Sequence, residues 1–203
     1  MLIETALALM GFAFVMSVSP GPGNFLLLAS GANFGLRRSL PLIFGISLGF
    51  LAMVIMVGLG FGRILGTHPE FGHVIRIACA VYVVWLAVKL ARSRSLGPGA
   101  RQQLSLPFTF MQAAMMQLLN PKAWTVAILV TAAYVDPTRP AASLATLVSV
   151  FALINIPSIS LWCISGTALR TILARGNRVA VFNIAMALLL LGSMAPVILA
   201  SAG

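Results

Sequence analysis

Two short polar interruptions break long apolar stretches of this 203-residue chain and carry most of the residues able to bind a ligand. The first reads Pro20-Gly21-Pro22-Gly23-Asn24, and the second reads Asn120-Pro121-Lys122. Proline and glycine do not continue an apolar helix, so each interruption is predicted to divide one helix into two half-helices. The second half-helix then begins with unpaired backbone N–H groups, which together with the helix dipole favour an anion. A ligand with a carboxylate, such as an amino acid, suits a site of this kind.

The polar residues at the breaks indicate how each one is organised. Asn24 stands where an N-cap is expected, so the second half-helices are expected to begin at Phe25 and at Ala123. The carbonyls freed before each break are expected to receive an ammonium group or a coupling cation. In the alternative, each proline only kinks a helix, and neighbouring helices satisfy the freed groups. Two matched breaks in one chain favour the binding site.

Lys122 is the one charged residue placed well inside an apolar span. A charge in that place costs roughly 2.5–3.5 kcal/mol on insertion scales, which makes it a candidate functional group. It is predicted either to contact a substrate carboxylate or to organise the break by binding freed carbonyls. In the alternative, its side chain extends to an interface or an aqueous cavity. Because a positive group at the start of a half-helix is unfavourable, its position indicates an anionic partner.

A further polar pair lies in the second half of the chain, around another proline. Asn155 and Ser158 are three positions apart, so they share one face of a helix. They are predicted either to line the same cavity or to join helices by hydrogen bonds. Together with the eight residues of the two breaks, they make up the candidate substrate-binding residues.

Other small residues indicate packing rather than chemistry. Gly45 and Gly49 have the spacing of small residues at a close contact between membrane helices. Cys79 and Cys163 are isolated in apolar runs and are interpreted as small packing groups, so neither a disulfide nor a metal site is expected.

The composition indicates that lipid surrounds these elements. Hydrophobic residues make up 60% of the chain and charged residues only 8%, whereas soluble domains contain roughly 25% charged residues. Basic residues outnumber acidic ones by 13 to 3, but they are scattered between apolar runs. Nucleic-acid binding would require a basic stripe on a polar face, so no nucleic-acid partner is expected.

Six apolar stretches are long enough to span a bilayer, which needs about 20 residues each. The chain is therefore predicted to be an all-α integral membrane protein with a single transporter domain over residues 1–203. Each half holds three spans and has its proline break in the first, so helices 1 and 4 are broken. Because three is odd, the second half inserts upside down, which gives an inverted repeat with a midplane site. The spans lie near residues 5–34, 38–63, 71–91, 106–134, 139–170 and 178–203, and the repeats near 1–92 and 106–203 with a loop at 93–105.

The distribution of basic residues orients the chain in the membrane. With the N-terminus outside, nine basic residues lie in cytoplasmic loops and three lie outside. Because basic loops are retained in the cytoplasm, both termini are predicted to lie outside it. The nine are Arg37, Arg38, Lys89, Arg92, Arg94, Arg101, Arg170, Arg175 and Arg178, and the three are Arg63, Arg76 and Arg139.

Four segments of the chain resemble the LysE/RhtB family of amino-acid exporters. Ser19–Ser39 is similar to the first family signature and Leu119–Trp124 to the second, and Gly45–Phe50 and Ala80–Lys89 also fit. The resemblance covers essentially the whole chain and is nearer to the branch that exports cysteine and O-acetylserine. It implies a six-span protein of the bacterial inner membrane that exports amino acids or close derivatives, driven by the proton-motive force.

One position departs from the family pattern. Many relatives have Asp after the second proline of the first signature, and the cysteine and O-acetylserine branch usually has Asn, whereas this chain has Gly23. No Asp or Glu lies deep in any predicted span. Proton coupling is therefore implied by the resemblance alone, without an acidic side chain that would explain it.

These observations predict a secondary transporter, and not an enzyme, that exports small amino acids or their derivatives across the inner membrane. Its partners are the amino-acid substrate and the lipid bilayer; a homo-oligomer is compatible with the sequence, and no cofactor is expected. Two alternatives of the same superfamily are a metal-ion exporter, which needs ligands deep in the spans, and a thiol-redox protein, which needs cysteines near the breaks. Cys79 and Cys163 lie in the third and fifth spans instead.

Cysteine labelling from outside the cell tests the predicted orientation. Ala202→Cys is expected to react with a membrane-impermeant maleimide, because the C-terminus is predicted to lie outside. Gly97→Cys, in the third loop, is expected to be protected until the membrane is permeabilised. Protection of the first position together with labelling of the second would contradict the orientation.

Overall fold

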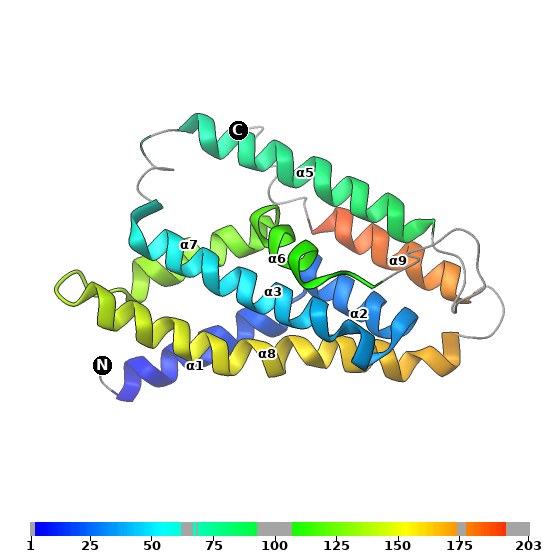
Figure 1. The fold of residues 1–203 in the computed structure, drawn as a ribbon, viewed down its shortest axis with the longest axis horizontal. Helices are drawn as coiled ribbons and strands as arrows, with labels where there is room; N and C mark the ends of the chain where they lie inside the picture. The colour runs from blue at the N-terminus through cyan, green and yellow to red at the C-terminus, as the bar shows by residue number, and fades with distance from the viewer. Residues whose placement is uncertain (1–2, 62–66, 68, 93–106, 174–177, 194–203) are drawn as a thin grey trace.

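The computed structural model describes residues 3–61, 67, 69–92, 107–173 and 178–193, and the regular structure within these ranges is helical throughout. The helices form one bundle in which α2 lies against α8 (Figure 1). The predicted loop at 93–105 and the end of the sixth predicted span, beyond residue 193, lie outside the described residues. The elements are α1 (Ile3–Val18), α2 (Pro22–Phe34), α3 (Leu36–Met56), the π-helical turn η1 (Val57–Phe61), α5 (Pro69–Ala91), α6 (Phe110–Leu118), α7 (Pro121–Tyr134), α8 (Pro140–Leu173) and α9 (Arg178–Gly192).

Several of these helices are long and apolar enough to cross a membrane. Helices α1 and α2 pass that test only as a pair, which is bent by 57° at its break, and α9 is a shorter apolar helix. Large apolar side chains such as Ile77 and Leu153 are exposed on the outside of the bundle, where lipid would cover them. The chain is thus a multi-pass membrane protein, and the regular structure of its described residues is helical. Within the described residues, the single helical segments that meet the criterion are Leu36–Phe61, His73–Ala91 and Pro140–Leu173.

Helix α2 is the most buried element, and it crosses α8 at backbone distance. A Cβ atom placed on Gly31 would lie 2.1 Å from the carbonyl oxygen of Cys163, and one on Gly166 would lie 2.0 Å from that of Leu28. Neither position has room for a side chain. Thr167 adds a hydrogen bond across the crossing, because its hydroxyl donates to the Gly31 carbonyl at 3.4 Å. The crossing therefore fixes the position of α2 against α8.

The predicted close-packing glycines lie at a second tight contact, between α3 and α6. A Cβ atom on Gly45 would lie 2.5 Å from the Cβ of Ala113, and one on Gly49 would lie 2.8 Å from the Cα of Ala114. The packing role inferred from their spacing is confirmed. This contact holds the short helix α6, and with it the second break, against α3.

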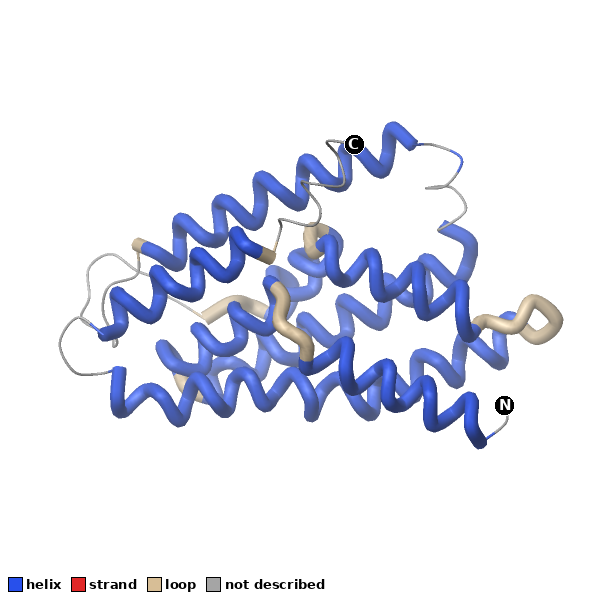
Figure 2. Tube along the Cα trace, turned by 180° about the vertical axis from the view of Figure 1, so that it is seen from behind, coloured by secondary structure: helices blue, strands red, loops and turns tan. Residues whose placement is uncertain are grey.

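Two further helices, α5 and α9, form one edge of the bundle. Figure 2 shows α5 and α9 side by side along the upper edge of the bundle, where they pack on each other. Cys79 on α5 and Cys163 on α8 are both free and buried, as expected for packing groups.

Both breaks occur within the predicted segments, but the half-helices begin earlier than the sequence suggested. Helix α2 starts at Pro22 rather than at Phe25, with Gly21 as its N-cap, and α7 starts at Pro121 rather than at Ala123, with Asn120 as its N-cap. The prediction that Asn24 is an N-cap is therefore wrong. The physical reason is that proline is favoured in the first helical turn, where its missing N–H has no partner to lose.

Filling the crossing between α2 and α8 is expected to destabilise the bundle. Gly166→Ala should lower the stability by about 1–3 kcal/mol or more, because the added Cβ overlaps the backbone of α2. Gly11→Ala is the matched control, since nothing lies within 4 Å of a Cβ there and alanine favours the helix. Thermal unfolding of both variants in detergent, followed by circular dichroism, measures the difference. Equal midpoints would contradict the close crossing.

Candidate functional site

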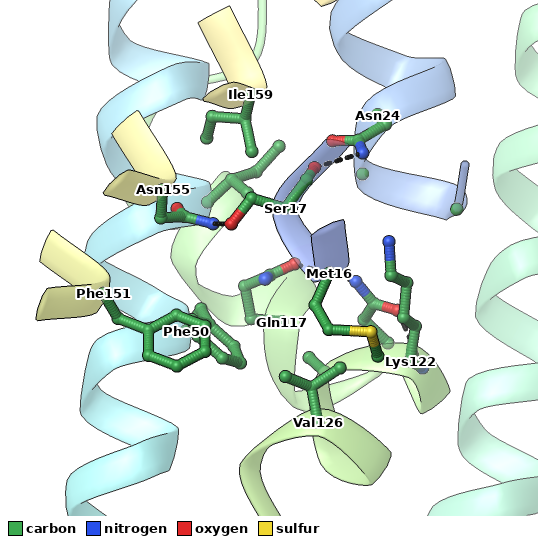
Figure 3. A pocket seen from close by; sticks show the side chains of 15 residues that line it. Met16, Ser17, Asn24, Phe50, Gln117, Lys122, Val126, Phe151, Asn155 and Ile159 are labelled. Atoms are coloured by element: carbon green, nitrogen blue, oxygen red, sulfur yellow. Dashed lines mark hydrogen bonds between the residues drawn. The ribbon is translucent and has the colours of Figure 1, made fainter. Parts of the chain in front are cut away.

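A small cavity lies where the two breaks meet, and six helices contribute to its wall (Figure 3). Its volume is about 50 Å³. The wall combines polar groups from the breaks with aromatic and aliphatic side chains from α3 and α8. The lining residues are Met16, Ser17, Gly21, Gly23, Asn24, Ile46, Phe50, Gln117, Asn120, Lys122, Ala123, Val126, Phe151, Asn155 and Ile159.

The fold brings six of the ten candidate residues to this cavity and leaves four outside its wall. Those at the wall are Gly21, Gly23, Asn24, Asn120, Lys122 and Asn155. The other four are the three prolines of the breaks, which shape the backbone behind the wall, and Ser158, which is buried elsewhere on α8; they are Pro20, Pro22, Pro121 and Ser158.

Sequence reasoning missed two polar residues of the wall. Ser17 lies on the last turn of α1, and Gln117 lies on the last turn of α6. Each precedes its break by only a few positions, and an isolated polar residue so close to a break was the available signal. The apolar residues of the wall gave no such signal in the sequence, because Phe50 and Phe151 cannot be distinguished from other residues of an apolar span.

The carbonyls at the end of α1 are satisfied by side chains of the protein itself. The amide nitrogen of Asn24 donates to the carbonyls of Ser17 and Ser19, at 2.8 Å each. The indole nitrogen of Trp162 donates to the carbonyl of Val18 at 3.0 Å. Asn24 therefore reaches back over the break instead of capping the helix that follows it. The sequence predicted that a ligand's ammonium group or a cation would bind these carbonyls. In this structure, side chains of the protein bind them.

Lys122 joins the two breaks. Its ammonium group donates a hydrogen bond to the Ser19 carbonyl, 103 residues away in the chain. Its side chain passes directly over Gly21, where an added Cβ would lie 2.7 Å from the lysine Cδ. Lys122 was predicted either to contact a substrate carboxylate or to bind freed carbonyls. The structure contains the second contact, because Lys122 binds the carbonyl of Ser19. The contact is favourable because a positive group lies at the carbonyl end of α1.

The half-helices that follow the breaks differ in how their N-termini are satisfied. In α7, the side-chain oxygen of Asn120 accepts a hydrogen bond from the backbone N–H of Lys122 at 3.2 Å, and its amide nitrogen donates to Gln117 at 3.1 Å. In α2, the N-cap is Gly21, which has no side chain to accept such a bond. The backbone N–H groups of Gly23 and Asn24 have no acceptor among the described residues. Of the two half-helices, α2 is therefore the one whose N-terminus keeps unpaired N–H groups, which favour an anion.

Asn155 connects α8 to α1 at the opposite side of the cavity. Its amide nitrogen donates to the Ser17 hydroxyl oxygen at 2.9 Å. Its amide oxygen is buried and has no hydrogen-bond partner among the described residues. Two roles were predicted for Asn155, a bond between helices and a place in the cavity wall. The structure contains both, because the residue joins α8 to α1 and also lines the cavity.

The cavity is positively polarised. Lys122 is the only ionisable residue in its wall, and no carboxylate lines it. A Cβ atom on Gly23 would make only ordinary contacts, the nearest at 3.6 Å to Ile46, so the position has room for the larger residues that related sequences are expected to carry. A site with one ammonium group, free N–H donors and apolar walls can hold a carboxylate together with a small uncharged group.

Comparison with known proteins places the sequence in a family. The model of the LysE type translocator family matches residues 14–199. A Cysteine/O-acetylserine efflux protein of Escherichia coli O139:H28 (strain E24377A / ETEC) is 30% identical over 182 residues, which are 89% of this chain and 90% of the relative. The protein of the same name in Escherichia coli (strain K12) is 30% identical over 181 residues, 88% of this chain and 90% of the relative.

A further relative, which has no assigned function, matches a shorter region of the chain. An "uncharacterized membrane protein" of Vibrio cholerae is 29% identical over 139 residues, 68% of each chain. No solved structure matches the chain. The family model covers nearly the whole sequence, including both breaks and every residue of the cavity wall, and the chain therefore belongs to the LysE-type translocator family.

Proposed function

We propose that this protein is a secondary transporter that exports a small neutral amino acid, or a close derivative of one, from the cytoplasm across the inner membrane. Membership of the translocator family and the efflux function named for its relatives support export of an amino acid. The observation that carries the assignment to this site is the ammonium group of Lys122 beside the uncapped N-terminus of α2. Both features attract a carboxylate, which every amino acid has.

The carboxylate would be held by groups that are already in position. The backbone N–H groups of Gly23 and Asn24 supply two donors at the positive end of α2. Lys122 supplies a third, because an ammonium group has three N–H donors and the Ser19 carbonyl takes only one. The substrate therefore need not displace Lys122 from the first break in order to bind it.

The rest of the wall favours a small side chain without charge. The cavity of about 50 Å³ offers room for only a few water-sized groups. Phe50, Val126 and Phe151 supply apolar surface. Because no carboxylate lines the cavity, a cationic side chain would find no counter-ion there, and Lys122 would have to serve both carboxylates of an acidic substrate.

The architecture that fits this function is six spans in two inverted repeats of three helices, near residues 1–92 and 106–203. In this arrangement α1 with α2, and α6 with α7, are the broken first spans of the two repeats. The bond from Lys122 to Ser19 supports it, because it joins corresponding breaks in the two halves. Rocking of one repeat against the other around the cavity would give alternating access, with both termini outside the cytoplasm.

The proposal includes export driven by the proton-motive force. Within the cavity wall, Lys122 is the residue that can exchange a proton, so it is the proposed coupling group. The comparisons do not favour the alternatives of a metal-ion exporter or a thiol-redox protein, and neither cysteine belongs to the cavity wall.

Removing the lysine amine is expected to slow export strongly. Lys122→Ala should lower the rate of L-cysteine and O-acetyl-L-serine efflux at least about tenfold, since a hydrogen bond to a charged group contributes about 1.5–3 kcal/mol. The measurement is the accumulation of both compounds outside cells that express each variant, quantified by mass spectrometry at equal membrane abundance.

Lys89→Ala is the matched control, because Lys89 lies on α5 against the rings of Trp85 and Phe108, away from the cavity. It should retain the wild-type efflux rate. Wild-type efflux by Lys122→Ala would exclude this residue from the transport site. A wild-type protein that raises the efflux of no amino acid in a broad metabolite screen would contradict the proposed function as a whole.

A further inference from the structure

The unpaired oxygen of Asn155 marks a second polar contact point in the cavity. Asn155 is only 7% exposed, yet its side-chain oxygen has no partner among the described residues. Buried polar atoms are hydrogen-bonded in the great majority of cases, and one that is not calls for a specific explanation. Asn155 is part of the cavity wall. Its oxygen has almost no accessible surface of its own, so a bound molecule becomes its partner once the amide turns toward the cavity.

Helix pairing alone does not explain this side chain. The bond between α8 and α1 uses only the amide nitrogen of Asn155, which donates to Ser17. The nitrogen already donates to Ser17, so the atom of this side chain that has no partner at all is the oxygen, which can only accept a hydrogen bond.

The charge distribution of the cavity indicates which donor this acceptor would receive. Figure 3 shows Asn155 and Lys122 on opposite sides of the pocket, with Ser17 between them. The positive groups, namely Lys122 and the N-terminus of α2, lie on one side and suit a carboxylate. The Asn155 side is neutral and offers an acceptor, which suits an ammonium group.

We propose that Asn155 is the specificity-determining residue that accepts the substrate's α-ammonium group and so fixes the direction in which a zwitterion lies in the cavity. This inference rests on the proposed function. The carboxylate then lies at α2 and Lys122, the ammonium group lies at α8, and the substrate's side chain faces the apolar wall. An amide oxygen accepts a hydrogen bond from an ammonium group without adding a charge to the membrane interior. The cavity therefore selects substrates that have an amine and is still able to release them.

Two ligands that differ only in the amine test this assignment. L-cysteine and 3-mercaptopropionate have the same thiol and carboxylate, but only the first has an α-ammonium group. Binding of each to the purified full-length protein is measured by isothermal titration calorimetry under reducing conditions. The wild type is expected to bind L-cysteine about tenfold more tightly, as a hydrogen bond to a charged group implies.

The variants separate recognition of the amine from a structural role. Asn155→Leu should weaken L-cysteine binding about tenfold and leave 3-mercaptopropionate binding unchanged, so that the preference disappears. Asn155→Asp should keep or increase the preference, because a carboxylate is also an acceptor for an ammonium group. Ser149→Ala, on an exposed turn of α8, is the control that should behave as the wild type.

Three outcomes would overturn the inference. Asn155→Leu could retain the preference for L-cysteine, or it could weaken both ligands equally, which would indicate a purely structural role. Asn155→Asp could lose the preference although it folds as the wild type does by size-exclusion chromatography. If the wild-type protein binds neither L-cysteine nor any other zwitterionic amino acid, the proposed function fails, and this result is distinct from a failure at Asn155 alone.

Discussion

The backbone groups freed at the first break, between Val18 and Pro22, are the constraint on which the site depends. In a lipid environment no water satisfies such groups, so the protein has to supply partners for them. Asn24, Trp162 and Lys122 do so for the carbonyls at the end of α1. Because Lys122 comes from the second break and Trp162 from α8, the first break can adopt this shape only when both halves of the chain are packed together.

The two breaks resemble each other in sequence but differ in what they leave open. Asn120 closes the N-terminus of α7 with its side chain, whereas Gly21 leaves that of α2 uncapped. Gly21 also provides the space through which the Lys122 side chain passes. One break therefore supplies the open helix terminus and the other supplies the charge. The proposed anion site is accordingly a single one, shared between the halves, rather than one in each.

Much of this arrangement could be predicted from local sequence signals, and the errors have physical causes. Prolines and glycines inside apolar stretches located both breaks, and an isolated lysine marked the cavity. The starts of the half-helices were wrong because proline belongs to the first turn of a helix rather than preceding it. Asn24 was misassigned because its side chain bonds backward to α1, and Ser17 and Phe151 were missed because only the packing of α1 against α8 brings them to the wall.

A structure of the protein with L-cysteine bound tests the central claim most directly. The account predicts that the ligand carboxylate lies within hydrogen-bond distance of the backbone nitrogens of Gly23 and Asn24 and of the Lys122 ammonium group. A carboxylate bound at the N-terminus of α7, or a ligand bound outside the cavity between the two breaks, would contradict it.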